Sequence, residues 1–143
     1  MLWRHADADD GAPDAARRLT PKGVKQAEKM GKWLRARLPA QIVVLTSPAR
    51  RAVETAQALK LDYRTDAALG TGAAPEALIA VTGWPDAAEA MVVVGHQPTL
   101  GEVAALLMSG RAAEWSIKKG GIVWLESRGG EAALRAALSP DLL

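Results

Sequence analysis

Two short runs of apolar, mostly β-branched residues mark the centre of the predicted fold. They are QIVVLT at residues 41–46 and MVVVG at residues 91–95. Each run is continuous rather than alternating, which is typical of a parallel strand that is buried on both faces. Residues 2–4 are a shorter apolar stretch and are interpreted as the end of a first strand. Residues 61–67 are a weaker strand candidate.

Helices are predicted between these strands. Thr20 and Pro21 form a cap-plus-proline start. Apolar residues then recur at helical spacing until Pro39 ends the helix. The pair Ser47 and Pro48 repeats this signal and predicts a helix to about residue 60. A short helix is expected at residues 75–81, and a further one, capped by Thr99, up to residue 109.

The last two strands are expected at residues 121–127 and 132–138, with a turn at Arg128-Gly129-Gly130. Residues 6–18 are rich in Asp, Ala, Gly and Pro, and are predicted to be a surface loop. The alternation of strands and helices favours an α/β fold, a three-layer α/β/α sandwich. Its sheet should be mostly parallel, with an antiparallel C-terminal hairpin.

Composition narrows the class of protein. A length of 143 residues with 49% hydrophobic residues fits a single domain, residues 1–143, that can bury a core. There is no apolar run long enough for a membrane span and no signal-peptide pattern, so a cytoplasmic location without membrane contact is expected. Cysteine is absent, which excludes disulfides and cysteine nucleophiles. The chain is expected to be a monomer.

Polar clusters follow three of the predicted strands. They are Arg4-His5, residues 47–51 with Arg50 and Arg51, and His96; the chain has no other histidine. The carboxyl ends of parallel strands share one edge of a sheet, so these clusters can converge. A pocket with two imidazoles and several guanidiniums would suit a doubly charged anion, and phosphate is the obvious candidate. Each residue taken alone is more often structural; their joint position at strand ends favours a functional pocket.

Four segments resemble the histidine phosphatase superfamily, which is phosphoglycerate-mutase-like, and within it the short SixA-type phosphohistidine phosphatases. The segments are LWRHADA at residues 2–8, LTPKGVKQA at 19–27, SPARRAVETA at 47–56 and VGHQP at 94–98. They occur in the order and at the spacing of the family, and they span nearly the whole chain.

The resemblance implies a role for each matching residue. His5 would be the nucleophile that is transiently phosphorylated, while Arg4, Arg51 and His96 hold the phosphoryl oxygens. Arg17 matches a further phosphate-contacting arginine of the short branch. Arg50 is a rival to Arg51, although the S-P-x-x-R register favours Arg51. No cofactor is implied, and no His, Asp or Glu cluster has a recognisable metal-ligand spacing.

The sequence departs from the wider family in one respect. Most members place a Glu or Asp after the third strand as general acid, but residues 67–74 contain no acid. Glu76 is better explained as a first-turn helix carboxylate, and Asp7, Asp9 and Asp10 as residues of a solvated loop. Imidazole leaves readily from phosphohistidine, since its pKa is about 6.5. The missing acid therefore favours hydrolysis of the P–N bond of phosphohistidine.

The expected partner is a phosphohistidine-bearing protein such as a phosphotransfer domain. Only residues 70–86 are available to cover the pocket, so the site should be open. Two alternatives remain: a phosphatase for small phosphomonoesters that uses Glu76 or Asp7 as acid, and a non-catalytic phosphoprotein-binding module. Nucleic acid is not expected as a partner, because stacking aromatic residues at useful spacing are missing.

Overall fold

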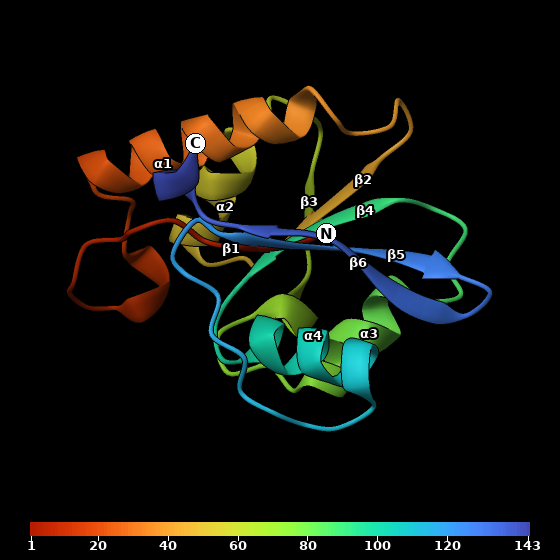
Figure 1. Ribbon diagram of the computed structural model, residues 1–143. Helices are drawn as coiled ribbons and strands as arrows, with labels where there is room; N and C mark the ends of the chain where they lie inside the picture. The colour runs from red at the N-terminus through yellow and green to blue at the C-terminus, as the bar shows by residue number, and fades with distance from the viewer.

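Six strands form one mixed sheet in the computed structural model, which describes residues 1–143 (Figure 1). The strands lie in the order β3-β2-β4-β1-β5-β6. β1 pairs in parallel with β4, β4 with β2, and β2 with β3, whereas β5 is antiparallel to both β1 and β6. Their bounds are β1 (Leu2–Arg4), β2 (Val43–Thr46), β3 (Arg64–Thr65), β4 (Met91–Gly95), β5 (Ile122–Arg128) and β6 (Glu131–Leu138).

Helices cover both faces of the sheet, which confirms the predicted three-layer α/β/α sandwich (Figure 1). α1 (Pro21–Arg35) and α2 (Arg50–Gln57) lie on one face, and α3 (Pro75–Thr82) and α4 (Thr99–Ser109) lie on the other. Three short 3-10 turns complete the chain: η1 (Asp14–Ala16), η2 (Ala67–Leu69) and η3 (Pro140–Leu142). The predicted C-terminal hairpin is confirmed, with positive φ angles of 61° and 83° at Gly129 and Gly130.

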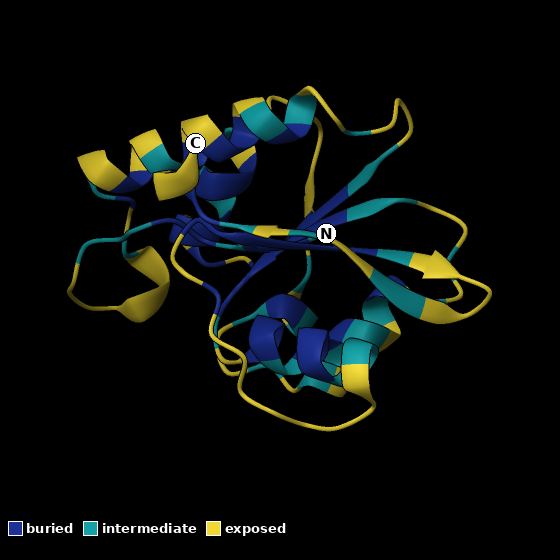
Figure 2. Cartoon of the chain, viewed as in Figure 1, coloured by how far each residue is buried: buried dark blue, intermediate teal, exposed yellow.

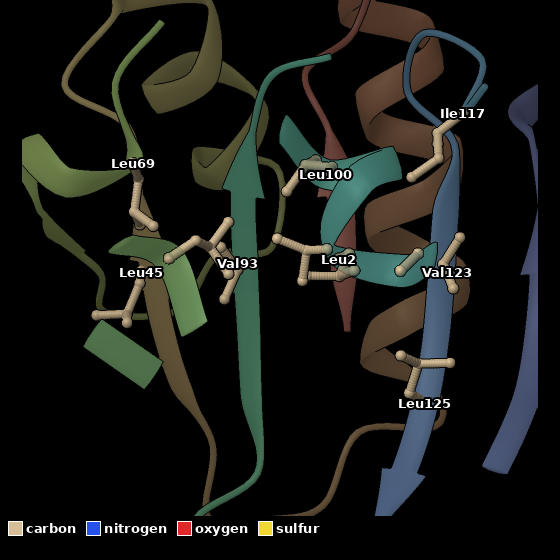
Figure 3. Packing of buried hydrophobic residues seen from close by; sticks show 11 residues of the cluster. Leu2, Leu45, Leu69, Val93, Leu100, Ile117, Val123 and Leu125 are labelled. Carbon is tan, nitrogen blue, oxygen red and sulfur yellow. The ribbon is translucent and has the colours of Figure 1, made fainter. Parts of the chain in front are cut away.

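Side chains alternate across the sheet and so divide the core into two clusters. Leu2 and Leu45 belong to the cluster under α3 and α4, while their neighbours Trp3 and Val44 belong to the cluster under α1 and α2. This follows from the two-residue period of a β-strand. The centre of the sheet is buried (Figure 2), and the first cluster packs its leucines and valines together on one face (Figure 3).

The start of α1 is built as predicted and rests against the segment that follows β1. The Thr20 hydroxyl accepts a hydrogen bond from the Gly23 amide at 2.9 Å. A Cβ added to Gly23 would lie 1.9 Å from the Asp7 carbonyl oxygen. A glycine at this position therefore allows the first helical turn to approach the chain just after His5. The helix ends at Arg35, four residues before the expected end at Pro39.

Two predicted helix caps are wrong. α2 begins at Arg50, and Ala49 is its N-cap residue, without a side-chain cap. Ser47 lies before that cap; its hydroxyl accepts from the Ala49 amide at 3.2 Å. Thr99 is already the first residue of α4, and its hydroxyl donates to the Ala73 carbonyl at 2.6 Å. Both hydroxyls make contacts beyond the helix start that local capping rules do not anticipate.

Candidate active site

The register of two central strands places the two histidines side by side. Arg4 is paired with Gly95, so β1 and β4 end at the same level and His5 and His96 follow together. The His5 amide donates to the Gly95 carbonyl at 3.0 Å. The two imidazole centroids are 5.1 Å apart, and both side chains are buried. The structure thus brings together two of the residues predicted for the site.

Arg51, in the first turn of α2, reaches both imidazoles. Its Nε donates to His5 Nε2 at 3.3 Å, and its Nη2 lies 3.5 Å from His96 Nδ1. Arg51 is 2% exposed. Its neighbour Arg50 is exposed and pairs with Glu54 at 2.8 Å on the outside of the helix. Of the two rival arginines, only Arg51 therefore lies in the site.

Arg4 and Arg17 complete the cationic wall of a pocket of about 280 Å³. Arg4 Nη1 donates to the Ile117 carbonyl at 2.7 Å, and Arg17 Nη1 donates to the Asp9 carbonyl at 3.1 Å. The pocket has one apolar lining residue, Ala8. Its other lining residues are Arg4, His5, Asp10, Asp14, Arg17, Arg51, Thr71, His96, Gln97 and Lys119.

The tautomer of His5 follows from its hydrogen bonds. Nδ1 lies 2.8 Å from the Ala6 carbonyl oxygen, which can only accept, so Nδ1 carries the proton. Nε2 is then the unprotonated nitrogen and faces Arg51. Burial lowers the pKa of His5 from 6.5 to about 4; the hydrogen bond to Ala6 raises it, and the nearby arginine charges lower it further. The imidazole is therefore neutral at pH 7, as a nucleophile requires.

His96 has the opposite tautomer, with its proton on Nε2 instead of Nδ1. Its Nε2 lies 2.7 Å from the Ser47 hydroxyl oxygen. The guanidinium of Arg51 can only donate to Nδ1, so the proton sits on Nε2 and is donated to Ser47. Burial lowers the pKa of His96 to about 4, with smaller contributions from His5 and the charge of Arg51. Ser47, expected to be a helix cap, is thus a hydrogen-bond partner of a pocket residue.

A nuclear magnetic resonance titration should show both perturbed histidines. Because the chain has only two, their ring nitrogens can be followed without overlap in a long-range ¹H–¹⁵N spectrum. We expect both midpoints near 4, with each imidazole neutral above that pH and charged below it. Nitrogen shifts at pH 7 should report protonated Nδ1 for His5. Single His→Gln variants assign the signals, and a midpoint near 6.5 for either ring would contradict the buried site.

Neither of the two acids considered as proton donors, Glu76 and Asp7, lines the pocket. Glu76 is exposed in the first turn of α3 and does not line the pocket. Asp7 also lies outside the lining, because its carboxylate binds Lys119 at 2.7 Å and Thr20 at 2.8 Å. Asp10, interpreted as a solvated loop residue, does line the pocket.

Asp14 is a pocket residue that the sequence did not reveal. Its Oδ2 accepts from Arg51 Nη2 at 3.1 Å, and its Oδ1 pairs with Arg17 at 3.1 Å. The Arg51 guanidinium holds the pKa of this carboxyl below its usual range. The sequence contains one weak indication of Asp14, namely that the candidate phosphate ligand Arg17 lies three residues later. The contact between Asp14 and Arg51 depends on how the loop at residues 6–18 folds back, and this loop has no periodic pattern from which its path can be predicted.

No helix is long and apolar enough to cross a membrane. The structure contains no group of three or more His, Asp or Glu side chains placed to hold a metal ion.

Comparison with known families gives one match over the first half of the chain. Residues 1–70 match the model of the histidine phosphatase superfamily, branch 1. An uncharacterised protein of Mycobacterium tuberculosis (strain CDC 1551 / Oshkosh) is 39% identical over 110 residues, which cover 74% of this chain and 70% of that protein.

Solved structures extend the likeness to the whole fold. A protein from Nakamurella multipartitia, assigned as a phosphohistidine phosphatase SixA, is 29% identical with a TM-score of 0.82, over 97% of this chain and 95% of its own. The protein histidine phosphatase SixA, solved with tungstate, has a TM-score of 0.81 at 24% identity, over 99% and 96%. The latter likeness concerns the fold.

Proposed function

The chain belongs to the histidine phosphatase superfamily and is a phosphatase, and from this premise we propose that it hydrolyses phosphohistidine on a partner protein. His5 is the proposed nucleophile. Arg4, Arg17, Arg51 and His96 are the proposed ligands of the phosphoryl oxygens. These residues line one pocket at the carboxyl ends of β1 and β4 and the start of α2.

The reaction proceeds in two displacements. His5 Nε2 attacks phosphorus, an Nε2–P bond forms, and the P–N bond to the substrate imidazole breaks. The leaving nitrogen keeps the electron pair, and the ring departs as neutral imidazole because its other nitrogen already carries a proton. A water molecule then attacks phosphorus, the Nε2–P bond breaks, and inorganic phosphate is released. Throughout, Nδ1 keeps its proton because it is bonded to the Ala6 carbonyl. Fixed cations around the equatorial oxygens supply most of the stabilisation.

Phosphohistidine is favoured as the substrate because the segment that follows β3 places no carboxylic acid in the wall of the pocket. Residues 67–74 contribute only Thr71 to the lining, so this segment offers no proton donor of carboxylic type. Asp14 is ionised in its ion pairs with Arg51 and Arg17, and it has no proton to give. An alkoxide leaving group gains about 10²- to 10⁴-fold from a general acid, whereas imidazole leaves without one.

A protein-borne phosphoryl group also suits the lining. A small substrate is gripped mainly by apolar surface around its organic part, and Ala8 is the only apolar residue here. Residues 70–86 form a loop and α3, which packs beside α4 rather than over the pocket. The remainder of the substrate would then be held by contacts between the two proteins.

Turnover of different phosphoryl donors tests the proposal. We expect release of ³²P-phosphate from a phosphohistidine-bearing phosphotransfer domain to exceed hydrolysis of sugar phosphates, which have alkoxide leaving groups, by about 10²-fold or more in kcat/KM. The matched control is phosphoserine or phosphothreonine on a protein of similar size. Faster hydrolysis of sugar phosphates would overturn the assignment.

One observation favours a second candidate, a phosphatase for small phosphomonoesters. Asp10 lines the pocket and could protonate an alkoxide leaving group. In that case Asp10→Asn should lower hydrolysis of esters with poor leaving groups by about 10²-fold, while phosphohistidine turnover changes little. We propose further that residues 1–143 act as one domain and as a monomer.

A further inference from the structure

Hydrogen bonds within the protein engage every nitrogen of the Arg51 guanidinium. Nε donates to His5 at 3.3 Å, and Nη1 donates to the Asp14 backbone carbonyl at 2.9 Å. Nη2 lies 3.1 Å from the Asp14 carboxylate and 3.2 Å from the Thr71 hydroxyl. The crowded group is Nη2, so a phosphoryl group that binds Arg51 through Nη2 must replace some of these contacts. Among them, the contact to the Asp14 carboxylate is the one with opposite charge.

The carboxylate of Asp14 occupies the place of an anion between two guanidiniums. Oδ2 faces Arg51 and Oδ1 faces Arg17, each at 3.1 Å. The Thr71 hydroxyl donates to Oδ2 at 3.4 Å. Arginines bind carboxylates and phosphates through the same planar donors. Asp14 and a bound phosphoryl group therefore compete for the same N–H groups.

The Asp14 carboxylate is placed so that it can leave Arg51 and give way to a phosphoryl group. Its side chain is 55% exposed, so water can solvate the carboxylate once it leaves Arg51. It belongs to η1, a turn of three residues none of which is buried. Arg51, in contrast, has a side chain only 3% exposed and sits on α2. The movable member of the pair is thus the acid, and its movement leaves the core intact.

We propose that Asp14 is an internal competitor for the phosphate pocket, displaced from Arg51 when a phosphoryl group binds and returning to it when inorganic phosphate departs. Three arginines around one dianion would otherwise hold the product tightly, and product release limits the turnover of many enzymes. Asp14 replaces the departing phosphate with a charge of the same sign. The inference rests on the phosphatase activity but not on the identity of the substrate.

The test is the affinity of inorganic phosphate, measured by isothermal titration calorimetry in the absence of any substrate. Asp14→Asn keeps the size of the side chain and an acceptor oxygen but removes the charge. We expect phosphate to bind about 2- to 5-fold more tightly, the range that corresponds to a partly exposed ion pair. Asp14→Ala should act in the same direction. Circular dichroism confirms that each variant folds.

Asp10→Asn is the matched control. It removes the same charge from the wall of the same pocket, yet Asp10 forms no ion pair. A general change of field would tighten phosphate binding equally in both variants. If Asp14→Asn binds phosphate no better than Asp10→Asn, or more weakly than the wild type, Asp14 does not compete and merely orients Arg51. Failure of the phosphohistidine assay leaves this binding result untouched.

Discussion

Replacing His5 with alanine is expected to reduce turnover by about 10⁴-fold or more while inorganic phosphate still binds. The variant removes the nitrogen that accepts the phosphoryl group, and loss of a nucleophile typically costs effects of this order. The arginine wall remains, because Arg4 and Arg17 have hydrogen-bond partners other than His5. The measurement is single-turnover release of ³²P-phosphate together with trapping of the labelled enzyme.

Trapping distinguishes the two histidines. The wild type should carry an acid-labile, alkali-stable phosphoryl group, His5→Ala none, and His96→Ala a group still bound to His5. The difference follows from the proposed roles, since His96→Ala keeps the unprotonated Nε2 of His5 that accepts the phosphoryl group, whereas His5→Ala lacks it. A labelled His5→Ala variant, or one that keeps more than about 1% of turnover, would contradict the proposed nucleophile.

Replacing Arg51 with alanine is expected to lower kcat/KM by about 10²- to 10³-fold, the loss typical of one transition-state hydrogen-bond donor in a buried site. The Arg51 guanidinium forms hydrogen bonds with both imidazoles. Arg51→Lys should recover little, because an ammonium cannot reproduce the planar fork that meets His5, Asp14 and His96. The measurement is kcat/KM on the preferred phosphoryl donor, with unfolding temperature as a check of folding.

The adjacent arginine provides the matched control. Arg50→Ala removes the same charge from the same helical turn, but Arg50 is exposed and pairs with Glu54. We expect less than a 2-fold change, in line with the small contribution of exposed ion pairs. Equal losses in the two variants would show that the general charge of the helix start, rather than the contacts of Arg51, is what matters.

Local patterns were sufficient to predict the order of strands and helices. The runs at β2 and β4 favour a buried strand, since a strand covered on both faces carries a short continuous stretch of apolar, β-branched residues. The cap at Thr20 also depends on neighbours three residues away, and it was predicted correctly. The predicted helix starts were less accurate where they depend on remote contacts. Ser47 contacts His96 and Thr99 contacts Ala73, and neither residue caps a helix.

The residues of the pocket also fall into those that the sequence predicted and those that only the structure revealed. Sequence alone determined that His5 and His96 follow strands and that Arg51 lies at the start of a helix, because motif residues and strand ends are local features. The S-P-x-x-R register already favoured Arg51 over Arg50, and Arg51 is the one that points inward. Tertiary structure alone decided that Ala6 sets the tautomer of His5 and that Asp14 lies between two arginines. Those outcomes depend on strand register and on the path of an aperiodic loop. Both are set by contacts between residues far apart in the chain, which no local pattern encodes.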